Sequence, residues 1–295
     1  MKPAPFDYVA PTGIEETLEV LREHGDEAKV LAGGQSLVPM LNFRLARPAV
    51  LVDINHVAGL DGVEARTGTL HIGALTRQRG LESALAGSAP GGWELLREAA
   101  GHIGHLHIRT RGTVGGSLAH ADPAAELPAA VSALGAQLVL RSATGERVVA
   151  PDDFFEGFFT TCLAPEELLT EVRVPAWPEG TRGRLLEVSR RRGDFAQVAV
   201  AAVVSMADGR VTRAGVALAG VAGRTVQARE VADALVGQVP DAGTIAELAG
   251  DYAATLDPPS DTHGPGEYRQ ALARHLLGKA LTDVTGLAAP TASAA

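Results

Sequence analysis

The strongest restriction on the fold comes from a short apolar run, residues 28–32, that stops abruptly at Gly33 and Gly34. A helical pattern from Ile14 to a stop at Gly25 precedes this run, and another pattern at 36–46 follows it. A second apolar run lies at 50–54. Runs of this length that end at turn residues are typical of buried strands. Helix, strand, helix and strand in this order predict a small parallel α/β unit.

From about residue 60 the pattern indicates an α+β organisation. The expected elements are a strand at 70–75, a helix at 93–100, a long glycine-containing loop at 101–123, a helix at 124–134, a hairpin at 137–150 and a strand at 168–174. After a linker at 177–180, we expect strands near 184–190, 197–206 and 211–219 and then helices at 226–236, 242–255 and 267–281. The predicted domains are 1–176, with subdomains of about 1–56 and 57–176, and 177–285, followed by a flexible tail at 286–295.

Composition excludes several classes of function. The formal charge of −9 disfavours nucleic acid as a partner, because affinity for phosphate backbones needs clustered Lys and Arg. No apolar run is long enough to span a bilayer, and the N-terminus lacks a secretory signal, so a cytoplasmic location is the default expectation. The single Cys162 cannot build an intrachain disulfide or a four-cysteine metal site. Any redox centre must therefore be an organic cofactor, or metals on another chain.

Two glycine-rich motifs are the candidate phosphate-binding segments. In the first, Leu31 to Ser36, glycines let the backbone approach a ligand, and successive N–H groups before a helix form a concavity for phosphate. In the second, Gly115 and Gly116 stand between Thr113 and Ser117 and follow two arginines, Arg109 and Arg111. Two such cradles across a cleft could hold a diphosphate. The alternatives are that the first motif is only a tight turn and that the second is only a structural loop, neither of which binds a ligand.

Two long segments, AGGQSLVPMLNFRLA (32–46) and IRTRGTVGGSLAHADPAAELPA (108–129), resemble the FAD-binding medium subunit of carbon monoxide dehydrogenase and related molybdenum hydroxylases. The same module is the flavin domain inside xanthine dehydrogenase. The resemblance continues at 165–175, 189–204 and 264–277 and so covers nearly the whole chain. It implies an α+β fold: an FAD-binding domain of the vanillyl-alcohol oxidase and p-cresol methylhydroxylase type, then a small domain with a three-stranded antiparallel sheet and helices.

The resemblance also implies which residues bind FAD. They are Leu31, Ala32, Gly33, Gly34, Gln35 and Ser36, then Thr113, Val114, Gly115, Gly116 and Ser117, and further Asp122, Glu126, Ile103, Leu169 and Phe195. Relatives often carry His or Asn at position 35, Asn at 117 and Asp at 126. Asp122 and Glu126 would lie near the cofactor, Glu126 facing its hydroxyl-bearing chain, and the last three residues near the flavin. For those three, plain core packing is the alternative.

In that family, a molybdenum cofactor on a large subunit hydroxylates the substrate, and electrons pass through [2Fe–2S] clusters on a small subunit to non-covalent FAD and then to an external acceptor. The resemblance therefore implies these two partner subunits, a dimer of heterotrimers, and no catalytic residue or metal site on this chain. Arg109 and Arg111 are candidates to stabilise reduced flavin. The basic loop 190–194, which begins with three arginines, would influence access of the acceptor, and an ordinary solvated loop is the alternative.

Other interpretations stay open at this point. A stand-alone FAD-dependent oxidoreductase would act on a small molecule directly, although no constellation for a substrate base is evident. A binding or assembly module that has lost FAD is a third possibility. His102, His105, His107 and His120 could attach flavin or bind a metal, but loop histidines beside the cofactor or in solvent are the simpler interpretation. The substrate and the electron acceptor are not specified.

Overall fold

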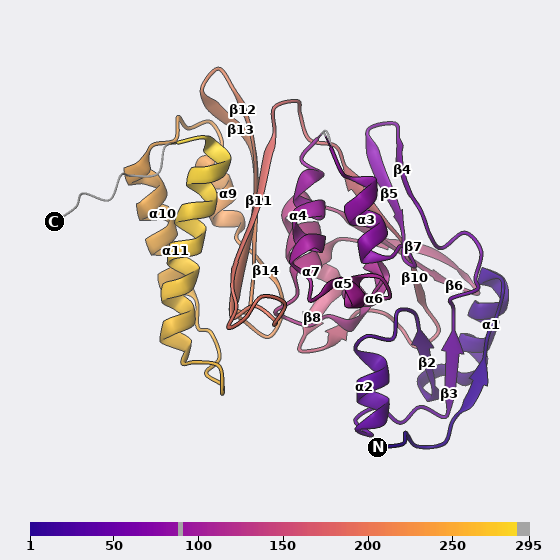
Figure 1. The fold of residues 1–295 in the computed structure, drawn as a ribbon. Coiled ribbons are helices and arrows are strands. Elements are labelled where there is room, and N and C mark those ends of the chain that lie inside the picture. Colours follow the sequence, from indigo (N-terminus) through magenta and orange to yellow (C-terminus); the bar gives the residue numbers. More distant parts are fainter. Residues whose placement is uncertain (88–90, 288–295) are drawn as a thin grey trace.

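The computed structural model describes residues 1–87 and 91–287 (Figure 1). Its N-terminal part is a parallel sheet in the order β1-β3-β2, formed by β1 (Asp7–Val9), β3 (Val50–Asp53) and β2 (Ala28–Leu31). Helix α1 (Ile14–His24) buries Leu18 and Leu21 against it and ends at Gly25, and the short η1 (Gly25–Glu27) leads into β2. The predicted parallel α/β unit is confirmed. Helix α2 (Leu37–Asn42) is shorter than predicted.

The central part is a five-stranded antiparallel sheet with helices against it. Its order is β4-β5-β10-β6-β7. The strands are β4 (Val63–Arg66), β5 (Thr69–Gly73), β6 (Gln137–Ser142), β7 (Gly145–Val149) and β10 (Leu168–Pro175). The helices are α3 (Gln78–Ala84), α4 (Glu94–His102), α5 (Leu106–Arg109), α6 (Val114–His120), α7 (Glu126–Leu134) and α8 (Pro151–Phe154), and a small ribbon pairs β8 (Phe155–Gly157) with β9 (Thr160–Thr161).

The predicted long loop at 101–123 is wrong, because α5 and α6 lie within it. Gly115 and Gly116 have low helix propensity, which makes the sequence look like a loop. In the structure, a Cβ at Gly115 would fall 2.5 Å from the Cβ of Ala74, so close packing against β5 and its following turn requires a glycine inside α6. Tertiary packing therefore outweighs local preference here.

The C-terminal part is an antiparallel sheet covered by helices on one face. The strands β11 (Arg182–Val188), β12 (Val198–Ala207) and β13 (Arg210–Ala219) match the three that were predicted, and the two-residue β14 (Val226–Gln227) adds a fourth. Asp208 and Gly209 both have positive φ, as the tight hairpin turn between β12 and β13 requires. The covering helices are α9 (Arg229–Leu235), α10 (Ala242–Thr255) and α11 (Gly266–Thr285) (Figure 1).

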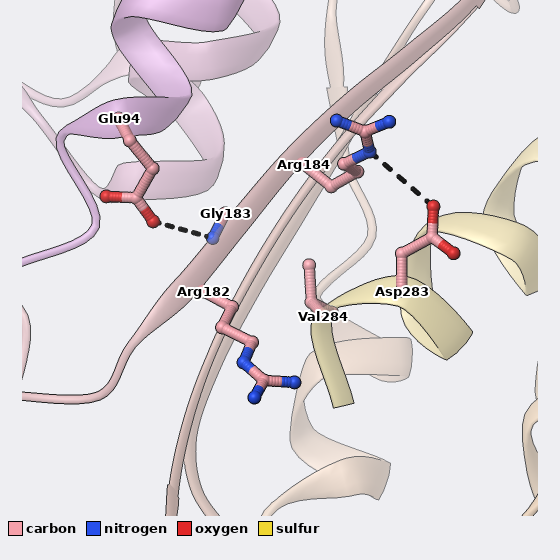
Figure 2. A pocket seen from close by; sticks show the side chains of 6 residues that line it. All are labelled: Glu94, Arg182, Gly183, Arg184, Asp283 and Val284. Carbon is pink, nitrogen blue, oxygen red and sulfur yellow. Dashed lines mark hydrogen bonds and ion pairs between the residues drawn. The ribbon is translucent and has the colours of Figure 1, made fainter. Parts of the chain in front are cut away.

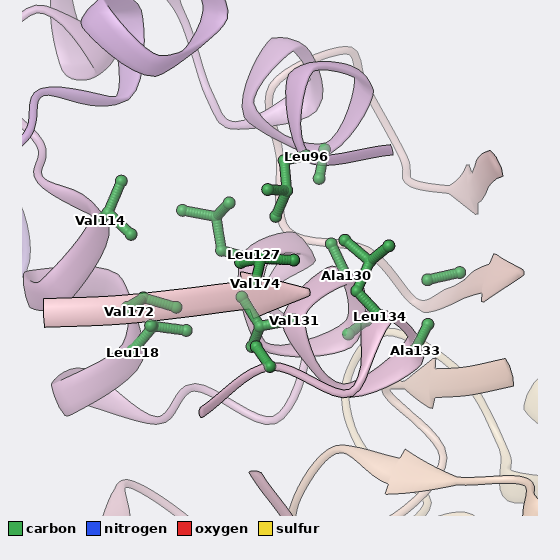
Figure 3. Close-up of a cluster of buried hydrophobic side chains, with 14 of the residues drawn as sticks. Leu96, Val114, Leu118, Leu127, Ala130, Val131, Ala133, Leu134, Val172 and Val174 are labelled. Atoms are coloured by element: carbon green, nitrogen blue, oxygen red, sulfur yellow. The ribbon is translucent and has the colours of Figure 1, made fainter. Parts of the chain in front are cut away.

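Helix α7 lies between the central and C-terminal sheets, and all nine of its residues are buried. Its Leu127 and Val131 gather with Val172 of β10 and Leu118 of α6 (Figure 3). Strand β12 is buried on both faces, because its alanines at 199 and 201 belong to this central core while its valines at 198 and 200 face the C-terminal helices. The two sheets are therefore parts of one continuous packing arrangement.

Trp177 begins the segment predicted as a linker, yet its side chain is an anchor. The ring is buried, its Nε1 donates to the carbonyl of Leu134 at 3.1 Å, and the guanidinium of Arg213 lies 3.9 Å from the ring centroid. The segment predicted as a linker connects β10 to β11 without regular structure, and Trp177 anchors its start. The predicted division of the chain at 176 and 177 stays a prediction. Of the predicted tail, 288–295 lie outside the described residues. Over the described part of the chain, no helix is both long and apolar enough to cross a membrane.

Replacing Trp177 with alanine should lower the free energy of unfolding by about 3–5 kcal/mol, because a large buried ring leaves a cavity at the junction of the two sheets. Trp177→Phe keeps most of the ring and loses the hydrogen bond, at a cost of about 1 kcal/mol. Urea denaturation followed by circular dichroism measures both. Equal stability of the alanine variant and the wild type would contradict this account of the anchor.

Candidate functional site

The first glycine motif is a turn from β2 into α2. Gly34 has a φ of 73°, and a Cβ there would lie 3.1 Å from a methyl of Val38, so the turn favours glycine. At Gly33 a Cβ would fall 2.5 Å from the carbonyl oxygen of Arg111 and 2.8 Å from the Cα of Gly112. The backbones of the two motifs are therefore in direct contact.

This turn presents unused backbone donors. Among the residues that the structure describes, the amides of Gly33, Gly34, Gln35 and Ser36 have no protein acceptor. The carbonyl of Gly33 accepts from Nε2 of its neighbour Gln35 at 3.2 Å. Successive N–H groups of this kind, next to the start of a helix, form the concavity that suits phosphate oxygens.

The second motif differs from its prediction as an amide nest. Thr113 caps α6 by accepting from the amide of Gly116 at 3.0 Å. The amides of Val114 and Gly115 donate to the carbonyls of Thr76 and Ala74, at 2.9 and 2.8 Å. These three amides already have protein partners. The glycines of this motif serve close packing, and the open amides belong to the first turn.

A polar network that sequence reasoning missed ties the two motifs together. Asn55 donates from Nδ2 to the carbonyl of Ala32 at 2.9 Å and accepts from Arg77 at 2.7 Å. The other side of the Arg77 guanidinium donates to the carbonyl of Arg111. The signal was available, because Asp53 and Asn55 are polar residues where a buried parallel strand ends, and ligands of open α/β sheets bind at that edge.

Asp53 supports this network through two hydrogen bonds. Its Oδ1 accepts from the amide of Asn55 at 2.9 Å, and its Oδ2 accepts from the hydroxyl of Tyr8 at 2.6 Å. Burial raises the pKa of the Asp53 carboxyl, but the hydrogen bonds from Tyr8 and Asn55 outweigh it and hold the pKa below its ordinary value. A charged Asp53 therefore fixes the orientation of Asn55 at neutral pH.

A cleft of about 380 Å³ opens where these elements meet. It is lined by Leu31, Ala32, Gly33, Gly34, Gln35, Val38, Pro39, Asp53, Asn55 and Arg111. The first five were predicted to bind the cofactor. Ser36 and the segment from Thr113 to Ser117 are not part of this lining. The lining thus combines open amides, an arginine and an apolar rim from α2, which fits a phosphate-bearing ligand such as FAD.

The remaining predicted residues lie in elements around α6 and α7. Ile103 follows α4 and packs against the central core, which includes the buried Leu169 of β10. Phe195 is 60% exposed in the connection from β11 to β12, so core packing does not explain it. Asp122 follows α6, and burial raises its pKa although Oδ1 accepts from the amide of Ala124. Glu126 begins α7.

The two candidate arginines have different surroundings. Arg109 donates from one terminal nitrogen to the carbonyls of Ile103 and Gly104, at 2.9 and 3.2 Å, and its Nε lies 3.5 Å from Glu82. It therefore holds the turn at 103 and 104, and its charge is already paired. The exposed Arg111 lines the cleft and is the better candidate to meet a ligand's charge.

A second hollow, of about 220 Å³, lies at the seam of α4, β11 and α11 (Figure 2). Glu94 accepts there from the amide of Gly183 at 2.9 Å, and Arg184 lies 3.5 Å from Asp283. None of the predicted site residues lines it. The hydrogen bond from Gly183 to Glu94 joins the central part of the chain to the C-terminal part, whereas the contact of Arg184 with Asp283 lies within the C-terminal part.

The four candidate histidines differ in exposure: His102 and His120 are half-buried, and His105 and His107 are exposed. His102 lies 3.1 Å from Glu187, measured from Nδ1 to Oε1, whereas His105 and His107 are exposed with ring centroids 5.8 Å apart. His120 is tilted against Phe159, with centroids 5.0 Å apart. Within residues 1–87 and 91–287, no group of three or more His, Cys, Asp or Glu side chains could hold a metal ion.

Comparison with known proteins identifies similar families. A model described as the FAD binding domain in molybdopterin dehydrogenase matches residues 4–177, and one for the CO dehydrogenase flavoprotein C-terminal domain matches residues 185–284. The chain is 40% identical to 6-hydroxypseudooxynicotine dehydrogenase complex subunit alpha of Paenarthrobacter nicotinovorans, over 99% of this chain and 98% of that protein. It is 35% identical to the carbon monoxide dehydrogenase medium chain of Afipia carboxidovorans, over 95% and 97% of the two chains.

Solved structures agree in fold. A chain of carbon monoxide dehydrogenase from Hydrogenophaga pseudoflava superposes with a TM-score of 0.92 at 35% identity, covering 98% of this chain and 100% of that one. A chain of quinoline 2-oxidoreductase from Pseudomonas putida 86 gives a TM-score of 0.88 at 36% identity, with 97% and 99% covered. Both parts of the chain therefore share their arrangement with these proteins.

Gly33→Ala should destabilise the protein by about 1–3 kcal/mol, because the new methyl group meets backbone atoms that have little freedom to move. Gly157→Ala is the matched control, since a Cβ there has nothing within 4 Å. The measurement is the urea midpoint of each variant. If the two variants were equally stable, the contact between the motifs would not be as close as described.

Proposed function

This chain belongs to the family of FAD-binding medium subunits of carbon monoxide dehydrogenase-like molybdenum hydroxylases, and from that premise we propose that it holds FAD non-covalently and carries electrons through it. FAD supplies the electron transfer itself. The protein supplies the cleft, the orientation of the cofactor and its electrostatic surroundings. The chain is thus a flavoprotein subunit of an oxidoreductase.

One observation carries the proposal for the diphosphate: the turn at 33–36 leaves its amides unused at the point where Gly33 contacts the Arg111–Gly112 backbone. A diphosphate placed there would accept from those amides and meet the charge of Arg111. The hydrogen bonds of Asn55 to Ala32 and of Arg77 to Arg111 support this placement, because they hold both walls of the cleft.

The other proposed contacts follow the family resemblance. Ser36 and the hydroxyl of Ser117 would add donors beside the diphosphate, with Thr113 to Gly116 forming the adjoining wall. Asp122 and Glu126 would lie along the hydroxyl-bearing chain of FAD. Ile103, Leu169 and Phe195 would border the flavin, where Arg109 supports the Ile103 turn from behind.

Electrons would reach FAD from [2Fe–2S] clusters on a small subunit, in a complex whose large subunit carries the molybdenum cofactor. The one cysteine of this chain cannot ligate such a cluster, which supports placing the clusters on another chain. We propose a dimer of these heterotrimers as the assembly. The exposed arginines at 190–192 would influence access of the final acceptor.

The relatives' names span caffeine dehydrogenase, nicotine 6-hydroxylase and carbon monoxide dehydrogenase. A medium subunit of one architecture therefore serves complexes with very different substrates, so the organic substrate is a property of the large subunit. A stand-alone FAD oxidoreductase is the alternative. Co-expression with the large and small subunits distinguishes the two: we expect a ternary complex with a flavin spectrum, whereas substrate oxidation by the isolated chain would favour the alternative.

Arg111→Gln should weaken FAD binding by about tenfold to a hundredfold, because a hydrogen bond to a charged group contributes about 1.5–3 kcal/mol. Arg66→Gln is the control, since Arg66 is exposed on β4, where it pairs with Glu64, and does not line the cleft. Titration of flavin fluorescence gives both dissociation constants. Identical dissociation constants for the two variants would show that the diphosphate does not bind in this cleft.

A further inference from the structure

A buried arginine at the start of α11 joins the two chain segments at the open end of the β12–β13 hairpin. Arg269, in the first turn of α11, is only 6% exposed. One of its terminal nitrogens donates to the carbonyl of Gln197, just before β12, at 2.5 Å and to that of Gly220, just after β13, at 3.1 Å. The other donates to Oδ2 of Asp261 at 2.8 Å. The planar guanidinium thus fixes three separate segments relative to one another.

The loop before α11 closes over the same junction. Nε2 of Gln197 donates to the carbonyl of His263 at 2.7 Å, and the amide of His263 donates to Oδ1 of Asp261 at 2.8 Å. Gly220 has a φ of 77°, and a Cβ there would fall 2.3 Å from the carbonyl oxygen of Gln197. The backbones at the open end of the hairpin are therefore in direct contact, and Arg269 is bound to both of them.

One side of this junction leads to Phe195. The amide of Gln197 donates to the carbonyl of Val188, the last residue of β11, at 2.7 Å. Ala196 is buried in the central core, whereas Phe195 before it is 60% exposed. Because Gln197 is held by its amide, its carbonyl and its side chain, the backbone of Phe195 is restricted on its C-terminal side.

The other side leads to the turn that contains Asp122. The amide of Gly220 donates to the carbonyl of Pro123 at 2.8 Å. Ala121, the first residue of this turn, has a φ of 50°, which residues other than glycine rarely adopt. Such a backbone conformation persists where its surroundings hold it. The turn at Asp122 is therefore connected to Arg269 through a single residue, Gly220.

We propose that Arg269 is a positioning residue for FAD, which acts through its neighbours and not by contact with the cofactor. Through Gln197 and Gly220 it sets the distance between the Phe195 segment and the Asp122 turn. The proposal rests on the function proposed above, in which Asp122 lies along the hydroxyl-bearing chain of FAD and Phe195 borders the flavin. A binding site that is fixed in advance loses less free energy when the ligand orders it.

The proposal extends FAD binding beyond the segment that carries the two glycine motifs. Arg269 lies outside residues 4–177, which match the FAD-binding model, and inside residues 185–284, which match the C-terminal one. The C-terminal part of the chain thus contributes to cofactor affinity through its long helix, in addition to covering the sheet.

Arg269→Lys tests this role, because an ammonium keeps the charge but lacks the planar fork that reaches both carbonyls and Asp261. The FAD dissociation constant, measured by titration of flavin fluorescence, should rise by about tenfold, as for the loss of one hydrogen bond to a charged group. Arg274→Lys is the matched control, since Arg274 is exposed on the same helix and should keep the wild-type constant. Equal dissociation constants for the two variants overturn the inference.

A double-mutant cycle separates positioning from general support of the fold. Arg269→Lys and Phe195→Ala should be non-additive: the double variant should bind FAD about threefold or more tighter than the product of the two single losses predicts. The visible circular dichroism of bound flavin should change in Arg269→Lys and not in Arg274→Lys. Additive losses with an unchanged flavin spectrum would leave Arg269 a purely structural residue and overturn the inference.

Hydrogen exchange of the wild-type chain provides a readout in case a variant fails to fold. Because coupling is reciprocal, FAD should slow exchange at the amides of Gln197 and Gly220 more than at that of Val211. The amide of Val211 donates to Gln238 at the other end of the same hairpin and is the matched reference. Equal protection of the three amides by bound FAD overturns this inference alone. A wild type that binds no FAD overturns the proposed function instead.

Discussion

The distance between the two glycine motifs depends on Gly33, whose missing side chain lets the backbone of the first turn lie against Arg111 and Gly112. At that separation Asn55 can reach Ala32 while Arg77 spans from Asn55 to Arg111. Wider spacing would leave these donors without acceptors and the cleft without a second wall. A close backbone contact therefore determines both the stability of the junction and the width of the cleft, and a large side chain at this point would disturb the two together.

Helix α7, at the other end of the site, also depends on a close backbone contact. It is apolar on all sides because it lies between two sheets, and a Cβ at Gly215 of β13 would fall 2.0 Å from the carbonyl of Ala133, so the C-terminal sheet approaches the helix closely. The helix also packs against α4, and its first residue, Glu126, is buried. Burial at this position raises the pKa of the Glu126 carboxyl to about 8.

Local signals predicted much of this arrangement. The apolar run at 50–54 and the Asp208–Gly209 turn specify structure within a few residues, and both are confirmed. The helix at 114–120 was missed because its glycines oppose helix formation and the compensating contact is with Ala74, far away in sequence. For the same reason the sequence could not show that Thr76 and Ala74 occupy the amides of the second motif, or that Arg109 is paired while Arg111 faces the cleft. The residues proposed at the flavin came from family resemblance, since nothing local distinguishes Leu169 from an ordinary core leucine.

The formal net charge of −9 does not show how charge is distributed within the molecule. The chain is acidic overall, yet Arg77 and Arg111 stand at the cleft and Asp53 is tied into hydrogen bonds with Tyr8 and Asn55. An anionic diphosphate in the cleft would thus meet positive charge, although the chain as a whole is acidic.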